Sequence, residues 1–252
     1  MSGHSKWHSI KHKKGAADAK RGKIFTKHAK LITIAAREGG GDTETNPGLR
    51  TAIDNAKTDN VPNSNIERAI KRGTGDLKEG AEISEVMYEA YGPEGIALYI
   101  QAVTDNKNRT VANVKSTLGK HGGNMGTSGS VAYLFHQKGL ILINASSDKH
   151  EDIELHAIDA GADDVKSENN NVEIYTNPKS LNDVKEKLEN AGYKIESSTI
   201  TFIPETEVPV TDEKKAEKIL KLMDVLEDDE DITNVYSNFD ISDEIMERLE
   251  TN

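Results

Sequence analysis

Apolar residues in the first third of the chain recur at intervals of three and four, the spacing of a helix with one buried face. Over residues 20–36 they are Ile24, Phe25, Leu31, Ile32 and Ala35. Gly39-Gly40-Gly41 ends this pattern. Two more helices are predicted, starting at Asn46-Pro47 and Val61-Pro62, because proline fits the first turn of a helix and Asn caps it. Residues 1–80 are therefore expected to form a three-helix unit.

From Ser84 onward the apolar positions follow the shorter period of strands. Strands expected over 86–91 and 96–103 flank Gly92-Pro93-Glu94-Gly95, a sequence typical of a hairpin turn. Further strands are expected over 130–135, 139–144, 172–175, 199–202 and 232–239, and helices over 108–121, 152–160, 180–191 and 212–226. This alternation predicts α+β units of the ferredoxin-like kind.

Composition narrows the class of protein. The 252 residues include no Cys, which excludes disulfides, a thiol nucleophile and thiolate metal sites. No apolar run approaches the ~20 residues that cross a bilayer, and residues 1–19 lack the apolar region of a signal peptide. We therefore expect a soluble protein of a reducing compartment.

Charge is divided unevenly along the chain. Residues 1–40 hold eight Lys and two Arg against Asp18 and Glu38, a net charge of +8, whereas the whole chain carries −11 and the remainder therefore −19. Lys20, Lys23, Lys27 and Lys30 are spaced three and four apart, so they share one face of the first predicted helix. This asymmetry predicts a basic arm that binds a polyanion.

The arm preceding that helix mixes cations with the only tryptophan, in Lys6-Trp7-His8-Ser9-Ile10-Lys11-His12-Lys13-Lys14. Lysines displace counterions from phosphates and an aromatic ring stacks on bases, a mixture that suits RNA or single strands. Alternatively, Trp7 anchors the arm onto the helical unit. His4, His8 and His12 share a helical spacing, but the surrounding lysines favour anion contacts over a metal site.

A second polar motif, Asp105-Asn106-Lys107-Asn108-Arg109-Thr110, joins a predicted strand to a predicted helix. Asn108 is the expected N-cap, and Lys107 and Arg109 beside the helix terminus form a candidate phosphate contact.

Two other segments suggest chemistry but are better explained structurally. The glycines of residues 122–130 follow a helix and precede a strand, the reverse of a nucleotide-binding loop, so we expect a helix-terminating loop. The acidic run 227–231 lacks the spacing of a calcium loop and is expected to be a solvated linker. No catalytic signature is present, which argues against an enzyme, a cofactor or a small-molecule substrate.

Three motifs in order, within residues 2–23, 105–110 and 122–131, resemble the signature of the YebC family, whose mitochondrial members are translational activators of cytochrome c oxidase. The resemblance covers essentially the whole chain. It implies an all-helical domain (1–80) and two α+β domains, with one (131–205) inserted in the other (81–130 plus 206–252). It also implies either a ribosome-associated factor that eases synthesis through proline runs or a DNA-binding transcriptional regulator.

The residues favour RNA, since the predicted basic helix carries lysines, which bind phosphates as point charges, and no helix-turn-helix with base-reading side chains is evident. We therefore expect ribosomal RNA as the partner, DNA as the alternative, and no membrane. Because the motifs begin at the first residues, we expect a bacterial cytoplasmic protein. The candidate contact residues are Lys6, Trp7, His8, Lys11, His12, Lys13, Lys14, Lys20, Arg21, Lys23, Lys27, Lys30, Lys107 and Arg109.

Overall fold

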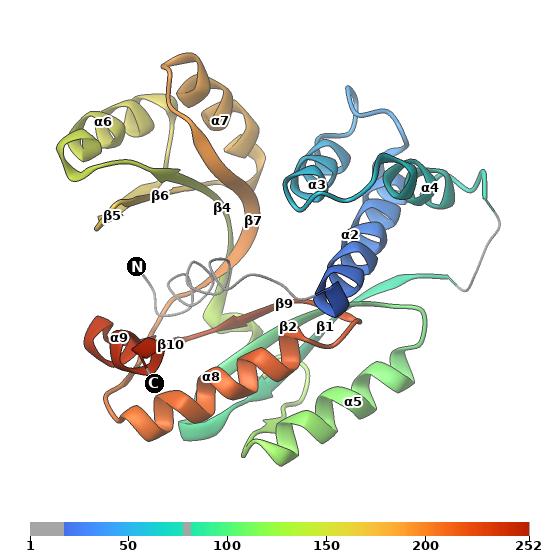
Figure 1. Ribbon diagram of the computed structural model, residues 1–252, viewed down its shortest axis with the longest axis vertical. Helices are drawn as coiled ribbons and strands as arrows, with labels where there is room; N and C mark the ends of the chain where they lie inside the picture. Colours follow the sequence, from blue (N-terminus) through green and yellow to red (C-terminus); the bar gives the residue numbers. More distant parts are fainter. Residues whose placement is uncertain (1–17, 78–81, 252) are drawn as a thin grey trace. The chain divides into compact units, whose positions relative to one another are not determined.

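The computed structural model describes residues 18–77 and 82–251, which form two compact units (Figure 1). One unit is Phe135–Glu205; the other combines the described residues before 135 with those after 205. Helices and mostly antiparallel sheets make up both α+β regions, and an all-helical segment precedes them. The predicted fold class, a helical segment followed by α+β structure, is therefore confirmed.

The helical segment contains the three predicted helices: α2 (Asp18–Gly39), α3 (Pro47–Thr58) and α4 (Asn63–Gly73). The Asn46 side chain caps α3 by accepting a hydrogen bond from the Leu49 amide at 3.0 Å. The shared core contains Ile32, Ala36, Leu49, Ile53, Ala56, Val61, Ile66 and Ala69.

Helix α2 buries two faces, although the sequence pattern predicts one. Ile32 and Ala36 pack into the core with α3 and α4. Ile34 instead packs with Ile83 and Val103, where β2 passes beside α2. The helix therefore joins the helical segment to the neighbouring sheet within the same unit.

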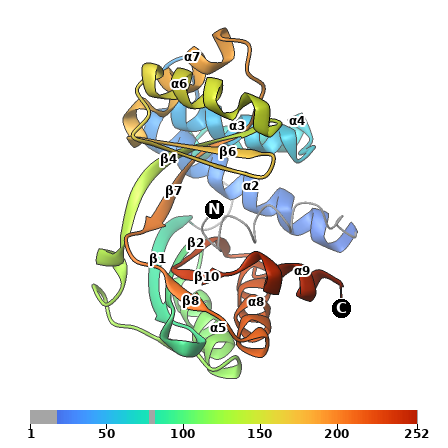
Figure 2. The ribbon, with the colours of Figure 1, turned by 90° about the vertical axis from the view of Figure 1, so that its left-hand side faces the viewer.

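That sheet has the strand order β3-β1-β2-β9. It consists of β1 (Ser84–Tyr91), β2 (Ala97–Thr104), the two-residue β3 (Asn124–Met125) and β9 (Ile232–Ser237). The hairpin predicted between β1 and β2 is present, with a 3₁₀ turn at Pro93–Gly95. Helices α5 (Lys107–Lys120) and α8 (Glu213–Glu227) lie side by side on one face (Figures 1 and 2).

The segments on either side of α8 complete this unit. Strand β8 (Val208–Val210) pairs in parallel with β10 (Phe239–Ile241), and helix α9 (Asp243–Thr251) follows. Residues from α5, α8 and both sheets share one hydrophobic core around Phe239, Leu98 and Leu118.

The unit formed by residues 135–205 has a sheet of order β5-β6-β4-β7, in which every pairing is antiparallel. Its elements are β4 (Phe135–Asn144), α6 (His150–Ala160), β5 (Asp164–Glu168), β6 (Asn171–Thr176), α7 (Leu181–Asn190) and β7 (Ile195–Pro204). Helices α6 and α7 cover one face of the sheet (Figure 2). The βαββαβ order agrees with the ferredoxin-like prediction.

One predicted strand is wrong. Residues 130–134 do not enter a sheet: Ala132–Leu134 form a 3₁₀ turn, and β4 begins only at Phe135. The amides of Val131 and Ala132 donate to the carboxylate of Glu89 at 2.7 and 2.8 Å, so they are unavailable to a neighbouring strand. Strands β5 and β8 were not predicted, because β5 carries mainly polar side chains and β8 is only three residues long.

Gly73 sets the distance between α4 and α2. A Cβ atom at this position would lie 2.4 Å from the Thr33 carbonyl oxygen and 2.7 Å from the Ala36 Cβ. We expect Gly73→Ala to destabilise the protein by roughly 1–3 kcal/mol, as overpacking does. By contrast, Gly119→Ala on α5, where a Cβ meets no atom within 4 Å, should be neutral or stabilising by up to about 1 kcal/mol. Urea unfolding of the two variants measures whether each substitution lowers or raises the free energy of unfolding.

Candidate nucleic-acid interface

The lysine stripe of α2 contacts the end of α8 and the loop that follows it. Lys23 Nζ donates to the Asp228 carbonyl at 2.9 Å, Lys27 Nζ to the Glu227 carbonyl, and Lys30 Nζ to the Glu230 carbonyl at 2.8 Å. The last carbonyls of a helix lack intrahelical donors and carry the negative end of the helix dipole. The stripe therefore binds a partial negative charge within its own unit.

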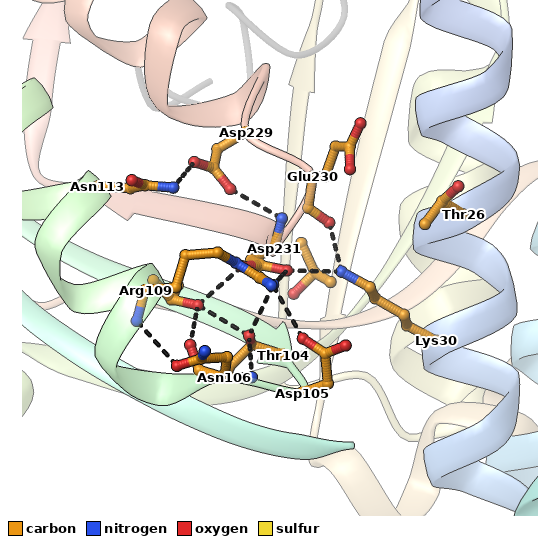
Figure 3. A network of polar contacts seen from close by, with 12 residues as sticks. Thr26, Lys30, Thr104, Asp105, Asn106, Arg109, Asn113, Asp229, Glu230 and Asp231 are labelled. Atoms are coloured by element: carbon orange, nitrogen blue, oxygen red, sulfur yellow. Dashed lines mark hydrogen bonds and ion pairs between the residues drawn. The ribbon is translucent and has the colours of Figure 1, made fainter. Parts of the chain in front are cut away.

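Asp231 is the centre of this contact (Figure 3). Its carboxylate accepts from Lys30 Nζ at 2.8 Å, from Arg109 Nη2 at 2.8 Å and from Thr110 Oγ1 at 2.8 Å. The residue is only 3% exposed. Burial by itself raises the pKa of Asp231, but the hydrogen bonds from Lys30, Arg109 and Thr110 outweigh it and hold the pKa at about 2.

The Asp105–Thr110 motif supplies the other two donors to Asp231, Arg109 and Thr110. The N-cap of α5 is Asn106 and the predicted Asn108 cap is wrong: Asn106 is extended, and its side chain accepts from the Arg109 amide at 3.0 Å. The helix therefore starts two residues earlier than predicted, and Arg109 lies in its first turn. The Arg109 guanidinium pairs with Asp231 at 2.8 Å and with Asp105 at 2.9 Å. Lys107 is exposed at the first position of the helix.

The acidic run 227–231 is therefore not a solvated linker, and that prediction is corrected. Asp231 is buried, and Asp229 accepts a hydrogen bond from the Asp231 amide at 2.8 Å, which shapes the turn. Asn113 on α5 also donates to Asp229, at 3.5 Å. The opposite charges of the lysine stripe and the acidic run were visible in the sequence, but no sequence signal paired them across about two hundred residues.

The glycine loop of residues 122–130 does resemble an anion cradle, but the anion belongs to the protein. Glu89 on β1 accepts from the amides of Gly129, Val131 and Ala132 at 2.6, 2.7 and 2.8 Å. Burial raises the pKa of Glu89, and these backbone hydrogen bonds reverse the effect, so its pKa lies below the usual value. These amides are thus occupied by a carboxylate.

The remaining predicted contact residues are placed only in part. Lys6, Trp7, His8, Lys11, His12, Lys13 and Lys14 lie outside the described residues, as does the histidine series of His4, His8 and His12. Lys20 and Arg21 belong to the first turn of α2, and Arg21 is exposed. The structure brings Lys23, Lys27, Lys30 and Arg109 together around the acidic run, whereas Lys107 is not part of this group of contacts.

Comparison with known proteins decides the family. Residues 5–76 match the TACO1/YebC protein N-terminal domain, and residues 83–239 match the TACO1/YebC second and third domain. The chain belongs to the TACO1/YebC family. The resemblance inferred from the three motifs is thereby confirmed.

Members of the family are similar to this chain over their whole length. A probable transcriptional regulatory protein of Halothermothrix orenii is 52% identical over 251 residues, covering 99% of each chain. One of Geobacter sulfurreducens is 55% identical over 249 residues, covering 99% of this chain and all of the relative. The crystal structure of a conserved hypothetical protein of Aquifex aeolicus has a TM-score of 0.85 at 47% identity, covering 94% of this chain and 97% of the other.

The described residues of this YebC-family protein contain neither a metal-binding cluster nor a membrane-spanning helix. Among residues 18–77 and 82–251, no group of three or more His, Asp or Glu side chains is arranged to hold a metal ion. In the same ranges, no helix combines the length and apolar character required to cross a bilayer.

Asp231 makes the stability of this YebC-family protein depend on pH. Its folded-state pKa lies below the usual value of 3.8, so its contribution is complete above about pH 5 and is lost as the pH falls toward 2. Lowering the pKa of Asp231 from 3.8 to about 2 corresponds to roughly 2.5 kcal/mol. We expect Asp231→Asn to lower the free energy of unfolding by about 2–4 kcal/mol at pH 7, because Lys30 and Arg109 lose their buried partner.

Urea unfolding at several pH values checks this expectation. The stability difference between the wild type and Asp231→Asn should shrink as the pH falls from 5 to about 2. Asp159→Asn, which removes an equal charge from an exposed position on α6, should reproduce neither effect. An Asp231→Asn protein as stable as the wild type at pH 7 contradicts the assignment.

Proposed function

We propose that this protein is a non-enzymatic regulator that binds nucleic acid through its basic N-terminal region, and that its target is ribosomal RNA. The observation that carries the proposal is the net charge of +8 in residues 1–40 against −19 in the rest of the chain. A local excess of this size releases counterions from a phosphate backbone, whatever the sign of the total charge. The relatives named probable transcriptional regulatory proteins support the broader class of nucleic-acid-binding regulator.

RNA is favoured because the described part of the basic surface is suited to phosphates. Lys20, Lys23 and Lys27 place point charges along one face of α2, without the forked donors that read base edges. Such a face positions a protein on a structured RNA and carries little sequence information. We propose that the protein docks on the ribosome by this region and eases synthesis through consecutive prolines.

The contacts of α2 with the acidic run are compatible with this role. Lys23 donates to a main-chain carbonyl, which carries no net charge, and an ammonium group has three donors. Lys30 differs, since its side chain is 16% exposed and paired with Asp231. We therefore assign phosphate binding chiefly to the arm, Lys20, Arg21, Lys23 and Lys27, and a structural role to Lys30 and Arg109.

A DNA-binding transcriptional regulator is the second candidate, and one observation favours it. Helices α3 and α4 are joined by the four residues 59–62, the connection length of a helix-turn-helix. The second helix carries Asn65, Arg68 and Lys71 at exposed positions, and Asn and Arg can read bases in the major groove. The sequence pattern alone did not show this arrangement.

Salt dependence tests the basic surface. Lys23→Gln/Lys27→Gln should weaken ribosome binding and reduce the slope of log K against log salt by roughly 1.4–1.8, since each lost phosphate contact removes about 0.7–0.9. Lys179→Gln/Lys194→Gln, which changes the charge equally at exposed positions of the 135–205 unit, should leave the slope unchanged. An unaltered slope in the first variant excludes α2 from the docking surface.

Two further measurements separate RNA from DNA. Ribosomes and duplex promoter DNA compete for the protein at matched salt, and preferential binding to ribosomes is expected. Ribosome profiling of a deletion strain should show pauses at consecutive proline codons. Altered transcript levels without such pauses, together with loss of duplex binding in an Arg68→Ala variant, would instead establish the DNA-binding candidate.

A further inference from the structure

A second basic region lies far from the N-terminal arm in sequence. Residues 106–147 contain no Asp or Glu, although the chain has 43 acidic residues in total. In the same segment stand Lys107, Arg109, Lys115, Lys120 and Lys138. Arg109 is held by Asp231 and Lys138 belongs to the 135–205 unit, so the other cations of this segment, Lys107, Lys115 and Lys120, all lie on α5.

The C-terminal half of α5 turns these cations outward. Val114 and Leu118 are buried in the core and fix the orientation of the helix. Lys115, Ser116 and Lys120 are consequently exposed, and neither lysine forms an ion pair with residues 18–77 or 82–251. The first half of the helix differs, because Asn113 and Arg109 there contact Asp229 and Asp231.

Two acidic side chains on the neighbouring β1–β2 hairpin already have partners within the protein. Glu89 accepts hydrogen bonds from the amides of Gly129, Val131 and Ala132. Glu94, in the hairpin turn, pairs with Lys215 at 2.6 Å. Neither carboxylate is therefore directed at the lysines of α5.

The loop that follows α5 exposes neutral polar side chains, and an exposed aromatic ring follows it in the sequence. Asn124, Thr127 and Ser128 are exposed, and Tyr133 stands just beyond them. Tyr133 is 68% exposed, the highest value among the exposed large apolar side chains of the described residues. The Glu89 cradle fixes the backbone up to Ala132, so this ring projects from an ordered support.

We propose that the C-terminal half of α5, the glycine loop and Tyr133 form a second contact surface, which binds single-stranded RNA. Exposed lysines and an exposed aromatic ring are the groups used to bind single strands, where the backbone is neutralised and a base stacks. Asn, Thr and Ser side chains add donors and acceptors for bases and for the 2′-hydroxyl. The inference deepens the proposed function and rests on it for the biological target, whereas the binding itself is separately testable.

The test measures binding of the full-length protein to a labelled oligouridine of about twelve nucleotides, within the range of known single-strand sites. Fluorescence anisotropy is recorded from about 50 to about 200 mM salt. Lys115→Gln/Lys120→Gln should reduce the slope of log K against log salt by about 1.4, corresponding to two single-strand phosphate contacts. Tyr133→Ala should weaken binding roughly 5- to 150-fold at every salt concentration, leaving the slope unchanged.

Matched variants exclude trivial explanations. Lys179→Gln/Lys194→Gln carries the same charge change and should leave binding unchanged, and Tyr133→Phe should retain most of the affinity because it keeps the ring. Urea unfolding midpoints confirm that every variant is folded. The proposal is overturned if Lys115→Gln/Lys120→Gln and Lys179→Gln/Lys194→Gln change the oligouridine affinity by the same amount. It is also overturned if Tyr133→Ala binds like the wild type, or if the effects appear only with duplex DNA.

Co-sedimentation with purified ribosomes separates this inference from the proposed function. If the wild type does not bind ribosomes but the oligouridine results hold, the proposed function fails and the RNA surface stands. If ribosome binding is lost in Lys23→Gln/Lys27→Gln and the oligouridine affinities of the α5 and Tyr133 variants match the wild type, the proposed function stands and this surface is excluded.

Discussion

The buried carboxylate of Asp231 joins three parts of the larger unit. It lies at the start of β9 and receives hydrogen bonds from α2 through Lys30 and from α5 through Arg109 and Thr110. An isolated buried charge is costly, so a carboxylate that is 3% exposed requires its cationic partners to remain in place. The position of the basic helix beside the sheet therefore depends on this group as well as on the packing of Ile34 with Ile83 and Val103.

The acidic part of the chain has a specific structural role. The same run that contributes Asp231 also presents the main-chain carbonyls that receive Lys23 and Lys27. Glu89 acts similarly on a smaller scale, since one carboxylate organises the amides of Gly129, Val131 and Ala132, at the end of the glycine loop and just after it. On α2 an internal anion occupies part of a region that the sequence pattern assigns to phosphate, so phosphate binding falls chiefly to the cations that Asp231 does not hold.

Local patterns predicted the helices and the longer strands because caps, turns and hydrophobic spacing are encoded by residues close together in the sequence. Asn46 and Gly92-Pro93 are examples, where a cap and a turn are encoded by adjacent residues. The errors came from distant partners. The strand predicted at 130–135 is displaced by Glu89, and the linker predicted at 227–231 is ordered by Lys30 and Arg109, about 40 and 100–200 positions away. Charge composition identified both partners of the main contact, but only the three-dimensional arrangement paired them.

The pairing of β2 with β9 has a consequence for the order in which the protein is built. Leu98 lies opposite Ser237, so this sheet closes only after synthesis has passed Ser237. All strands of the 135–205 unit leave the exit tunnel before β9, so that unit can complete its own sheet first. During that interval the cations of α2 have been synthesised and their acidic counterpart has not, so nascent chains pass through a stage in which those ammonium groups face only solvent and the translating machinery.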